Sequence, residues 1–203
     1  MLYVNGSSTQ PAKLDAVNKQ DLISHIYDNN RACWVLKFTS GKFAHILKTL
    51  VSNNTITSIT LPEGLTSIGK SAFSRCWKLT SITIPNGVTS IGSSAFYECS
   101  NLKSIILGNS VASIEDEVFS GCNLTSITIP ESVTSIGEYA FYGCNSLISV
   151  AITSRRVTSI GYGAFNGCSL ISVVCKSSTP PNIENMGSTW CISHSGFGLR
   201  GRR

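Results

Sequence analysis

The stretch from Leu79 to Cys99, LTSITIPNGVTSIGSSAFYEC, decides the fold of this chain because nearly the same string occurs again. A second copy runs from Leu124 to Cys144 as LTSITIPESVTSIGEYAFYGC, and a third from Ile56 to Cys76 as ITSITLPEGLTSIGKSAFSRC. More divergent copies begin at Leu102 and Leu147. Repeats of about 20 to 50 residues are typical of solenoids and propellers, whose copies pack against their neighbours. We therefore expect a stack of rungs.

The composition indicates a folded chain with nearly neutral repeats. Of 203 residues, 42% are hydrophobic and 13% are charged, which excludes a wholly disordered chain. Three of the five net positive charges come from Arg200, Arg202 and Arg203, so the repeats do not favour nucleic-acid binding. No run approaches the roughly 18 apolar residues of a transmembrane helix. The N-terminal string MLYVNGSSTQPAKL also lacks the zones of a signal peptide, so we expect a cytoplasmic chain unless a leader has been removed.

Each rung follows the pattern L-x-x-I-x-I-P-x-x-V-x-x-I-G-x-x-A-F-x-x-C. In the best copy, Ile82 and Ile84 are expected to point inward from a short strand, with Ser81 and Thr83 pointing outward. Pro-Asn-Gly then turns the chain, and V-x-x-I favours a second short strand. The A-F pair that follows, in the segment 93–97, predicts a helical turn that brings both side chains into the core.

Two residue types recur in step with the repeat. A column of phenylalanines is expected at Phe73, Phe96, Phe119, Phe141 and Phe165. Steps of 23, 23, 22 and 24 residues separate the cysteines of a second column, Cys76, Cys99, Cys122, Cys144 and Cys168. We expect buried thiols there, although neighbours in such a column are also placed to oxidise in a suitable compartment. No CxxC pair or His-Cys spacing indicates zinc.

The ends depart from the repeat. Residues 1–33 are expected to form a leader and an N-terminal cap helix over Asn18–Asp28, which covers the open apolar end or alternatively binds a partner. Residues 34–181 form the predicted solenoid of about six rungs plus a final strand, with Trp34–Phe38 as a degenerate first rung. Residues 182–203 are predicted to be an irregular tail.

Serine, threonine and aliphatic side chains occupy the positions expected to face outward from the longer strands. One column is Ser58, Ser81, Ser104, Ser126, Ser149 and Ser172. The other is Thr60, Thr83, Ile106, Thr128, Ala151 and Val174. Ile106, Ile148, Ala151, Ile171 and Val174 would make the surface more apolar towards the C-terminus. These columns are the candidate binding surface, although serine and threonine are also ordinary solvent-facing strand residues.

One string matches a nucleotide-binding motif by coincidence. Residues Gly64–Ser71, GLTSIGKS, fit the P-loop pattern G-x-x-x-x-G-K-[ST] and follow a predicted strand. The aligned strings are GVTSIGSS from Gly87 and SVTSIGEY from Ser132, so Lys70 occupies a variable outer position. The apolar residues of the string belong to the core columns. The repeat therefore argues against a phosphate site.

No catalytic or metal constellation is present. His25, His45 and His194 lack the partners that catalysis would need, and the serines form columns rather than a G-x-S-x-G elbow. The acidic run Glu115–Glu117 is expected to decorate an exposed corner, with a cation site as the alternative. We expect no enzymatic activity and no cofactor.

The repeat LTSITIPNGVTSIGSSAFYEC resembles the BspA-like, or treponemal-type, leucine-rich repeat of bacterial and some protist surface proteins. The resemblance covers roughly residues 35–181. It implies a curved right-handed solenoid with parallel strands on the concave face and short helical turns opposite. It also implies adhesion or protein binding at the cell surface or after secretion, although this chain shows no leader. The cysteine follows the phenylalanine turn here, unlike the ordinary leucine-rich repeat, in which asparagine or cysteine follows the strand.

Two functions follow from these patterns. The first is a non-catalytic module that binds a protein or a glycan through the concave sheet, in the manner of a bacterial adhesin. The alternative is a purely structural spacer, or a fragment of a larger adhesin. The residues do not specify the ligand or the oligomeric state.

Overall fold

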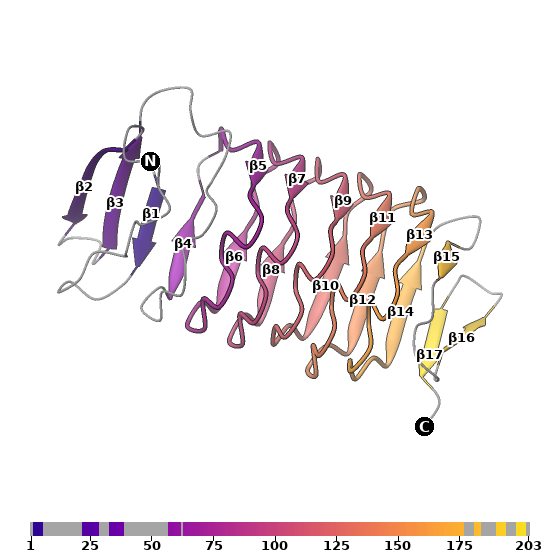
Figure 1. The fold of residues 1–203 in the computed structure, drawn as a ribbon. Coiled ribbons are helices and arrows are strands. Elements are labelled where there is room, and N and C mark those ends of the chain that lie inside the picture. Colours follow the sequence, from indigo (N-terminus) through magenta and orange to yellow (C-terminus); the bar gives the residue numbers. More distant parts are fainter. Residues whose placement is uncertain are drawn as a thin grey trace.

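The computed structural model describes a stack of strands. It covers the backbone of residues 2–5, 22–28, 33–38, 57–61, 63–176, 181–183, 190–193 and 198–201, and the side chains of 57–61, 63–176 and 181–182. Figure 1 shows the rungs arranged one after another along the molecule, with additional strands at both ends. Each rung contributes one longer and one shorter strand, and these form two rows that run the length of the array. The predicted repeat solenoid is confirmed, while its handedness and curvature stay predictions.

The longer strands form what we call the long-strand sheet. They are β4 (Ser58–Thr60), β6 (Ser81–Thr83), β8 (Ser104–Ile106), β10 (Ser126–Ile129), β12 (Ser149–Ile152) and β14 (Ser172–Cys175). The short-strand row contains β5 (Ser67–Ile68), β7 (Ser90–Ile91), β9 (Ser113–Ile114), β11 (Ser135–Ile136), β13 (Ser159–Ile160) and β15 (Asn182–Ile183). Pairing within each row is parallel and in step with the repeat, as Ile82 opposite Ile105 illustrates.

Each row is interrupted in its hydrogen bonding. The long-strand sheet is continuous over β6–β8 and over β10–β12–β14, and the short-strand row over β5–β7 and over β9–β11–β13–β15. A column of glycines accounts for the interruption in the short-strand row, which lies between β7 and β9. The amides of Gly92, Gly137 and Gly161 donate to the preceding strand at 2.7 to 2.9 Å. A Cβ at Gly92 would lie 2.6 Å from the Lys70 nitrogen. At the step between β7 and β9, where pairing is interrupted, this column holds Glu115, and we infer that its Cβ keeps the two strands apart.

The core is a stack of identical side chains. The rings of the phenylalanine column are fully buried, and successive ring centroids lie 5.1 to 5.5 Å apart with nearly parallel planes. Leucine, isoleucine, valine and alanine at the other predicted inward positions are buried around them. The column predicted from the repeat is therefore confirmed.

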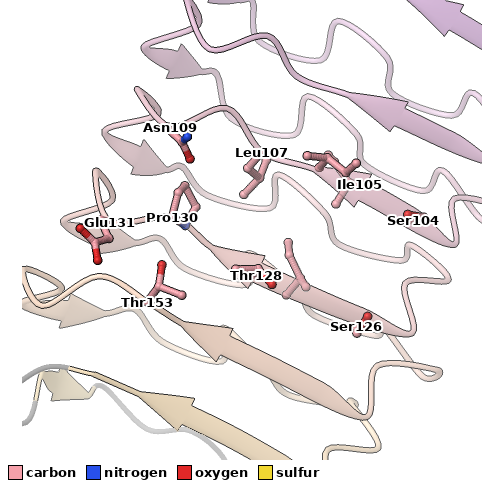
Figure 2. A pocket seen from close by; sticks show the side chains of 11 residues that line it. Ser104, Ile105, Leu107, Asn109, Ser126, Thr128, Pro130, Glu131 and Thr153 are labelled. Atoms are coloured by element: carbon pink, nitrogen blue, oxygen red, sulfur yellow. The ribbon is translucent and has the colours of Figure 1, made fainter.

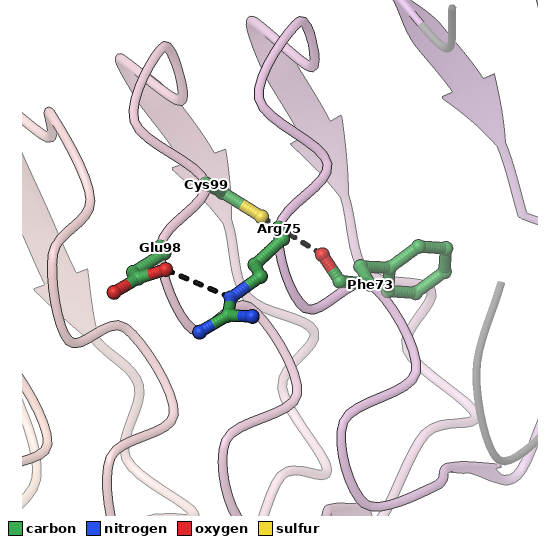
Figure 3. Close-up of polar contacts among 4 residues, drawn as sticks. All are labelled: Phe73, Arg75, Glu98 and Cys99. Carbon is green, nitrogen blue, oxygen red and sulfur yellow. Dashed lines mark hydrogen bonds and ion pairs between the residues drawn. The ribbon is translucent and has the colours of Figure 1, made fainter. Parts of the chain in front are cut away.

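The cysteine column is reduced and hydrogen-bonded to the preceding rung. The Cys99 thiol donates to the Phe73 carbonyl oxygen at 3.0 Å, as Figure 3 shows, and Cys122 bonds in the same way to Phe96 at 3.1 Å. Burial raises the pKa of Cys122 well above its usual value. No disulfide joins the described cysteines of the column, and all of them are buried except Cys168, which is partly exposed. This confirms a column of buried thiols rather than disulfides.

The predicted helical turn after each shorter strand is wrong. In residues 94–98 the backbone amides alternate between two kinds of acceptor. One set donates to carbonyl oxygens three residues earlier in the same rung, as Ala95 does to Gly92, and the other set donates to carbonyl oxygens of the next rung, as Phe96 does to Val118. An α-helix would instead pair each amide with a carbonyl four residues earlier in the same segment. Ser94 and Glu98 have positive φ values of 57° and 54°, which a right-handed helix excludes. We call this set of tight turns the turn edge.

The predicted N-terminal cap helix is also wrong. Leu22–Asp28 forms strand β2, which pairs antiparallel with β3 (Cys33–Phe38). β3 pairs antiparallel with β1 (Leu2–Asn5), and β1 pairs antiparallel with β4. The string LISHIYD is rich in residues that favour strands, and the exposed edge of a sheet is best satisfied by another strand. The expected strand at Trp34–Phe38 is present, but in this antiparallel sheet.

Strands also occur in the tail that was predicted to be irregular. β17 (Gly198–Gly201) pairs antiparallel with β14, and β16 (Trp190–Ser193) pairs antiparallel with β17. Both ends of the long-strand sheet are thus covered by antiparallel strands. The division of the chain at residues 33 and 181 stays a prediction.

Candidate binding surface

The outward face of the long-strand sheet carries the residues predicted as a candidate surface. Inward and outward positions alternate in β6, β8 and β10, where isoleucines are buried between exposed neighbours. None of the predicted surface residues is buried: Ser58, Thr60, Ser81, Thr83, Ser104, Ile106, Ser126, Thr128, Ile148, Ser149, Ala151, Ile171, Ser172 and Val174. Strand pairing places members of each column opposite one another within β6–β8 and within β10–β12–β14. These side chains are therefore exposed or half-exposed, and their role in binding stays a prediction.

The C-terminal end of this face is aliphatic. Val174, with 52% of its surface exposed, lies opposite Ala151 in the β12–β14 pairing. Ile171 is 71% exposed, and its amide donates to the Ile148 carbonyl oxygen at 2.9 Å. These four residues form two apolar pairs, each joining neighbouring rungs. Large aliphatic side chains exposed in a contiguous group are characteristic of interaction sites.

A groove lies where the long-strand sheet is interrupted. It occupies about 640 Å³ between β8 and β10, with Ile106 on one wall and Thr128 on the other. Figure 2 shows Ser104 and Ser126 towards one end of the groove, and the side chain of Glu131 towards the other. Its full lining is Ser104, Ile105, Ile106, Leu107, Asn109, Ser126, Ile127, Thr128, Pro130, Glu131 and Thr153. The groove thus combines hydroxyls, one carboxylate and an isoleucine that is 62% exposed.

Sequence reasoning identified part of this groove and missed the rest. Ser104, Ile106, Ser126 and Thr128 were predicted as outward residues. The residues just after each strand were missed, including Asn109 and Glu131, because the repeat grid treats them as turn positions. The sequence did contain a signal for these groove residues: the positions that follow each longer strand differ in residue type from one copy of the repeat to the next.

The chemistry of the groove suits binding. The Thr153 hydroxyl donates to the Ile129 carbonyl oxygen at 2.8 Å, and the Asn109 amide donates to the Asn86 side chain at 3.1 Å. Glu131 is the single carboxylate of the lining, and no histidine, cysteine or lysine accompanies it. The lining therefore offers hydrogen bonds and apolar contact rather than a nucleophile with its base.

The P-loop-like string is part of the core. Leu65 and Ile68 are fully buried or nearly so, and Lys70 is exposed. Ser71, which follows, has a φ of 55° and begins a tight turn. A P-loop needs a helix N-terminus at that point. The interpretation of this string as repeat structure is therefore supported.

Two residues of the acidic corner, Glu115 and Asp116, are exposed as predicted, whereas Glu117 is partly buried and accepts a hydrogen bond from the Ser94 hydroxyl at 3.0 Å. Glu115 accepts a hydrogen bond from Ser113 at 2.6 Å, and Asp116 accepts one from the Glu138 amide at 2.9 Å. Among the described residues, no group of three or more His, Cys, Asp or Glu side chains is arranged to hold a metal ion. The side chains of the three histidines lie outside the described residues. In the part of the chain that the structure describes, no helix has the length and apolarity to cross a membrane.

Solved structures with the same fold come from bacteria. A leucine-rich cell surface protein of Faecalibacterium prausnitzii is 32% identical with a TM-score of 0.59, over 82% of this chain and 40% of that one. The leucine-rich repeat protein of T. pallidum is 28% identical with a TM-score of 0.58, over 74% of this chain and 67% of that one. The pneumococcal vaccine antigen PcpA, at 18% identity and a TM-score of 0.55, shares the fold over 76% of this chain and 46% of that one.

The chain spans less than half the length of the Faecalibacterium protein. Comparison with curated proteins gives no significant match. The family model for the BspA type leucine rich repeat region, present in 6 copies, matches residues 38–148 and 66–188. With this match over most of its length, the chain belongs to the BspA-type leucine-rich repeat family.

Proposed function

We propose that this chain is a non-catalytic interaction module that binds a protein or a glycan through the outward face of its long-strand sheet. The observation that carries the proposal is the groove between β8 and β10, with the serine and threonine columns on either side of it. The hydroxyls supply directional hydrogen bonds, and Ile106 supplies an apolar contact in the centre of the face.

The aliphatic end of the sheet adds binding area. Removing apolar surface from water contributes about 25 cal/mol for each Å², so exposed Ile171 and Val174 favour any partner that covers them. The polar N-terminal part and the aliphatic C-terminal part would then contact different parts of one ligand.

A location at the bacterial surface is part of the proposal. It is supported by the Faecalibacterium relative, which is described as a cell surface protein. The alternative, a structural spacer within a larger adhesin, is supported by the 40% share of that relative which the chain spans. In a spacer, the outward columns would have no ligand of their own.

A binding screen with matched variants separates these two functions. The chain is tested against immobilised extracellular-matrix proteins and a glycan array, together with Ile106→Asp and Val174→Asp. Ala112→Asp is the control, since Ala112 is an exposed small apolar residue outside the long-strand sheet. We expect a ligand whose binding falls at least tenfold in the two sheet variants and is unchanged in the control. Equal binding by all variants would contradict the proposed surface, and no ligand in either screen would favour the spacer.

A further inference from the structure

Three tyrosines form a cluster on the turn edge, away from the long-strand sheet. The ring centroid of Tyr139 lies 5.6 Å from that of Tyr142 and 5.5 Å from that of Tyr162, with interplanar angles of 84° and 77°. Tyr142 and Tyr162 remain 47% and 44% exposed. We call Tyr139, Tyr142 and Tyr162 the tyrosine cluster. Its perpendicular rings make a corner rather than one flat surface.

The rung that follows leaves space for the central ring. Gly163 occupies the column position of Tyr139 one rung later, and a Cβ added there would lie 2.7 Å from Cε1 of Tyr139. The first two rungs have serine in this column, at Ser71 and Ser94. Glycine at residue 163 therefore lets the Tyr139 ring lie across the next rung, where Tyr162 meets it. The cluster depends on this combination, which does not recur in the described rungs.

Carboxylates border the cluster. Glu138 precedes Tyr139 and occupies the column position of Tyr162 one rung earlier. Its amide is held by the Asp116 carboxylate at 2.9 Å. Both acidic residues, with Glu115, line a second hollow of about 270 Å³ along the short-strand row, which also includes Gly161, the residue before Tyr162. Burial, followed by the neighbouring Tyr162, Glu138 and Tyr142, raises the pKa of Tyr139.

In the part of the chain that the structure describes, the carboxylates of this border form no ion pair with a basic side chain. The ion pair described on the turn edge joins Arg75 to Glu98 at 2.9 Å, in the first two described rungs (Figure 3). Among the described residues, no ion pair involves Glu115, Asp116 or Glu138. The region around the tyrosine cluster is therefore aromatic and negatively charged.

We propose that the tyrosine cluster and Glu138 bind the cationic head of a lysine or arginine side chain from a partner protein. A cation is attracted to the electron-rich face of a tyrosine ring, and a carboxylate at the rim adds direct attraction. A corner between perpendicular rings accommodates a narrow cationic side chain. A sugar ring would instead need one broad, flat aromatic face, which this arrangement does not offer. The site is separate from the long-strand sheet and does not rest on its function.

A peptide titration followed by NMR tests this site. The probe is the blocked peptide Gly-Gly-Arg-Gly-Gly, compared with the same peptide containing neutral citrulline. We expect the arginine peptide to shift the signals of the cluster with a millimolar Kd, and the citrulline peptide to bind at least fivefold more weakly. Tyr162→Leu and Glu138→Gln should each weaken arginine binding at least fivefold. Tyr97→Leu is the control, because Tyr97 occupies the Tyr142 column in an earlier rung outside the cluster.

A positioning variant separates ring geometry from ring removal. Gly163→Ser keeps all three tyrosines, and serine is already accepted with positive φ at Ser71 and Ser94 in this column. It should displace the Tyr139 ring and weaken arginine binding with little change in Tm. If Tyr162→Leu loses its fold, exposed Glu138→Gln carries the test.

Three results would overturn the proposal: equal binding of the two peptides, equal losses in the Tyr97 control, or shifts of the cluster by neutral oligosaccharides but not by arginine. Ile106→Asp and Val174→Asp should leave peptide binding unchanged. Failure at the long-strand sheet and failure at the tyrosine cluster are therefore distinguishable.

Discussion

The thiol of Cys122 donates a hydrogen bond of 3.1 Å to the carbonyl oxygen of Phe96, which belongs to the preceding rung. Cys144 bonds to Phe119 in the same way at 3.1 Å. Each rung is therefore joined to its predecessor inside the core, as well as through the strands and the turn edge. A free thiol suits this position because it is small, largely apolar and a weak donor.

The thiol column makes stability fall at alkaline pH. Burial raises the pKa of Cys122, and contact with the Cys168 thiol, followed by burial, raises that of Cys144. In the unfolded chain both thiols ionise near their ordinary pKa of about 8.5, so above that pH the folded state holds more protons. The contribution of these thiols to the free energy of unfolding should be constant below about pH 8 and then fall by up to about 1.4 kcal/mol per pH unit for each thiol.

Urea unfolding between pH 6 and 10 measures this dependence. A Cys122→Ala, Cys144→Ala double variant should be less stable at pH 7 but should show a shallower alkaline decline. A slope identical to that of the unaltered chain would show that these thiols do not carry the effect. In the folded chain, both thiols should also resist alkylation, and should react once the chain is unfolded.

Gly161 should not tolerate a side chain. A Cβ at this position would lie 2.7 Å from the backbone nitrogen of Glu138, and backbone cannot move aside without opening the strand pairing. Gly161→Ala should lower the free energy of unfolding by about 1 to 3 kcal/mol. Gly64→Ala is the matched control, since nothing lies within 4 Å of its added Cβ, and should change stability by about 1 kcal/mol or less. Equal losses in thermal or urea unfolding would argue against close packing at the glycine column.

Glu115→Gly should close the break between β7 and β9. With glycine in this column, the residue 115 amide can approach the Ile91 carbonyl as Gly92 approaches Ile68, at 2.9 Å. Hydrogen exchange of amide 115 should slow at least tenfold. Glu131→Gly, an exposed glutamate outside this column, should leave that amide unchanged. Unaltered exchange in Glu115→Gly would mean that the side chain is not what holds the strands apart.

Ser154 lies in the rung between Cys144 and Cys168, where the cysteine step is 24 residues rather than 23, and its hydroxyl holds the longer turn. The side chain is fully buried, and its hydroxyl bonds to the carbonyl oxygens of Glu131 and Val133 at 3.1 and 2.6 Å and accepts from the Arg156 amide at 3.1 Å. Ser154→Ala leaves these groups unsatisfied and should cost about 1 to 3 kcal/mol of stability. Exposed Ser110→Ala should stay within about 0.5 kcal/mol in the same unfolding measurement. A neutral Ser154→Ala would contradict this role.

The repeat predicted the core because one period places chemically identical residues in contact. Phe96 and Phe119 could be paired from their spacing alone, and their rings are stacked. The turn after them was misread as helical, because an A-F pair packs inward from a helical turn and from a tight turn alike. The sequence did contain a signal for a tight turn: glycine at residues 143 and 167, in the column of Glu98, where the backbone has positive φ.

What the repeat could not predict depends on contacts between unlike segments. Leu22–Asp28 fits a short amphipathic helix as well as a strand, and the choice is made by β3, which lies beside it. The outward columns followed from alternation in the strands. The groove between β8 and β10 did not, because it exists where strand pairing is interrupted rather than where the pattern holds.

A designed disulfide tests most directly whether the outward columns belong to one in-register parallel sheet. Ser126 and Ser149 are directly opposite each other in β10 and β12, a separation that a disulfide can bridge. The Ser126→Cys, Ser149→Cys variant should cross-link within the molecule under mild oxidation, detected by peptide mass mapping. A Ser126→Cys, Ser172→Cys variant, two rungs apart, should not. Cross-linking of the second pair, or failure of the first, would contradict the arrangement on which the proposed binding surface depends.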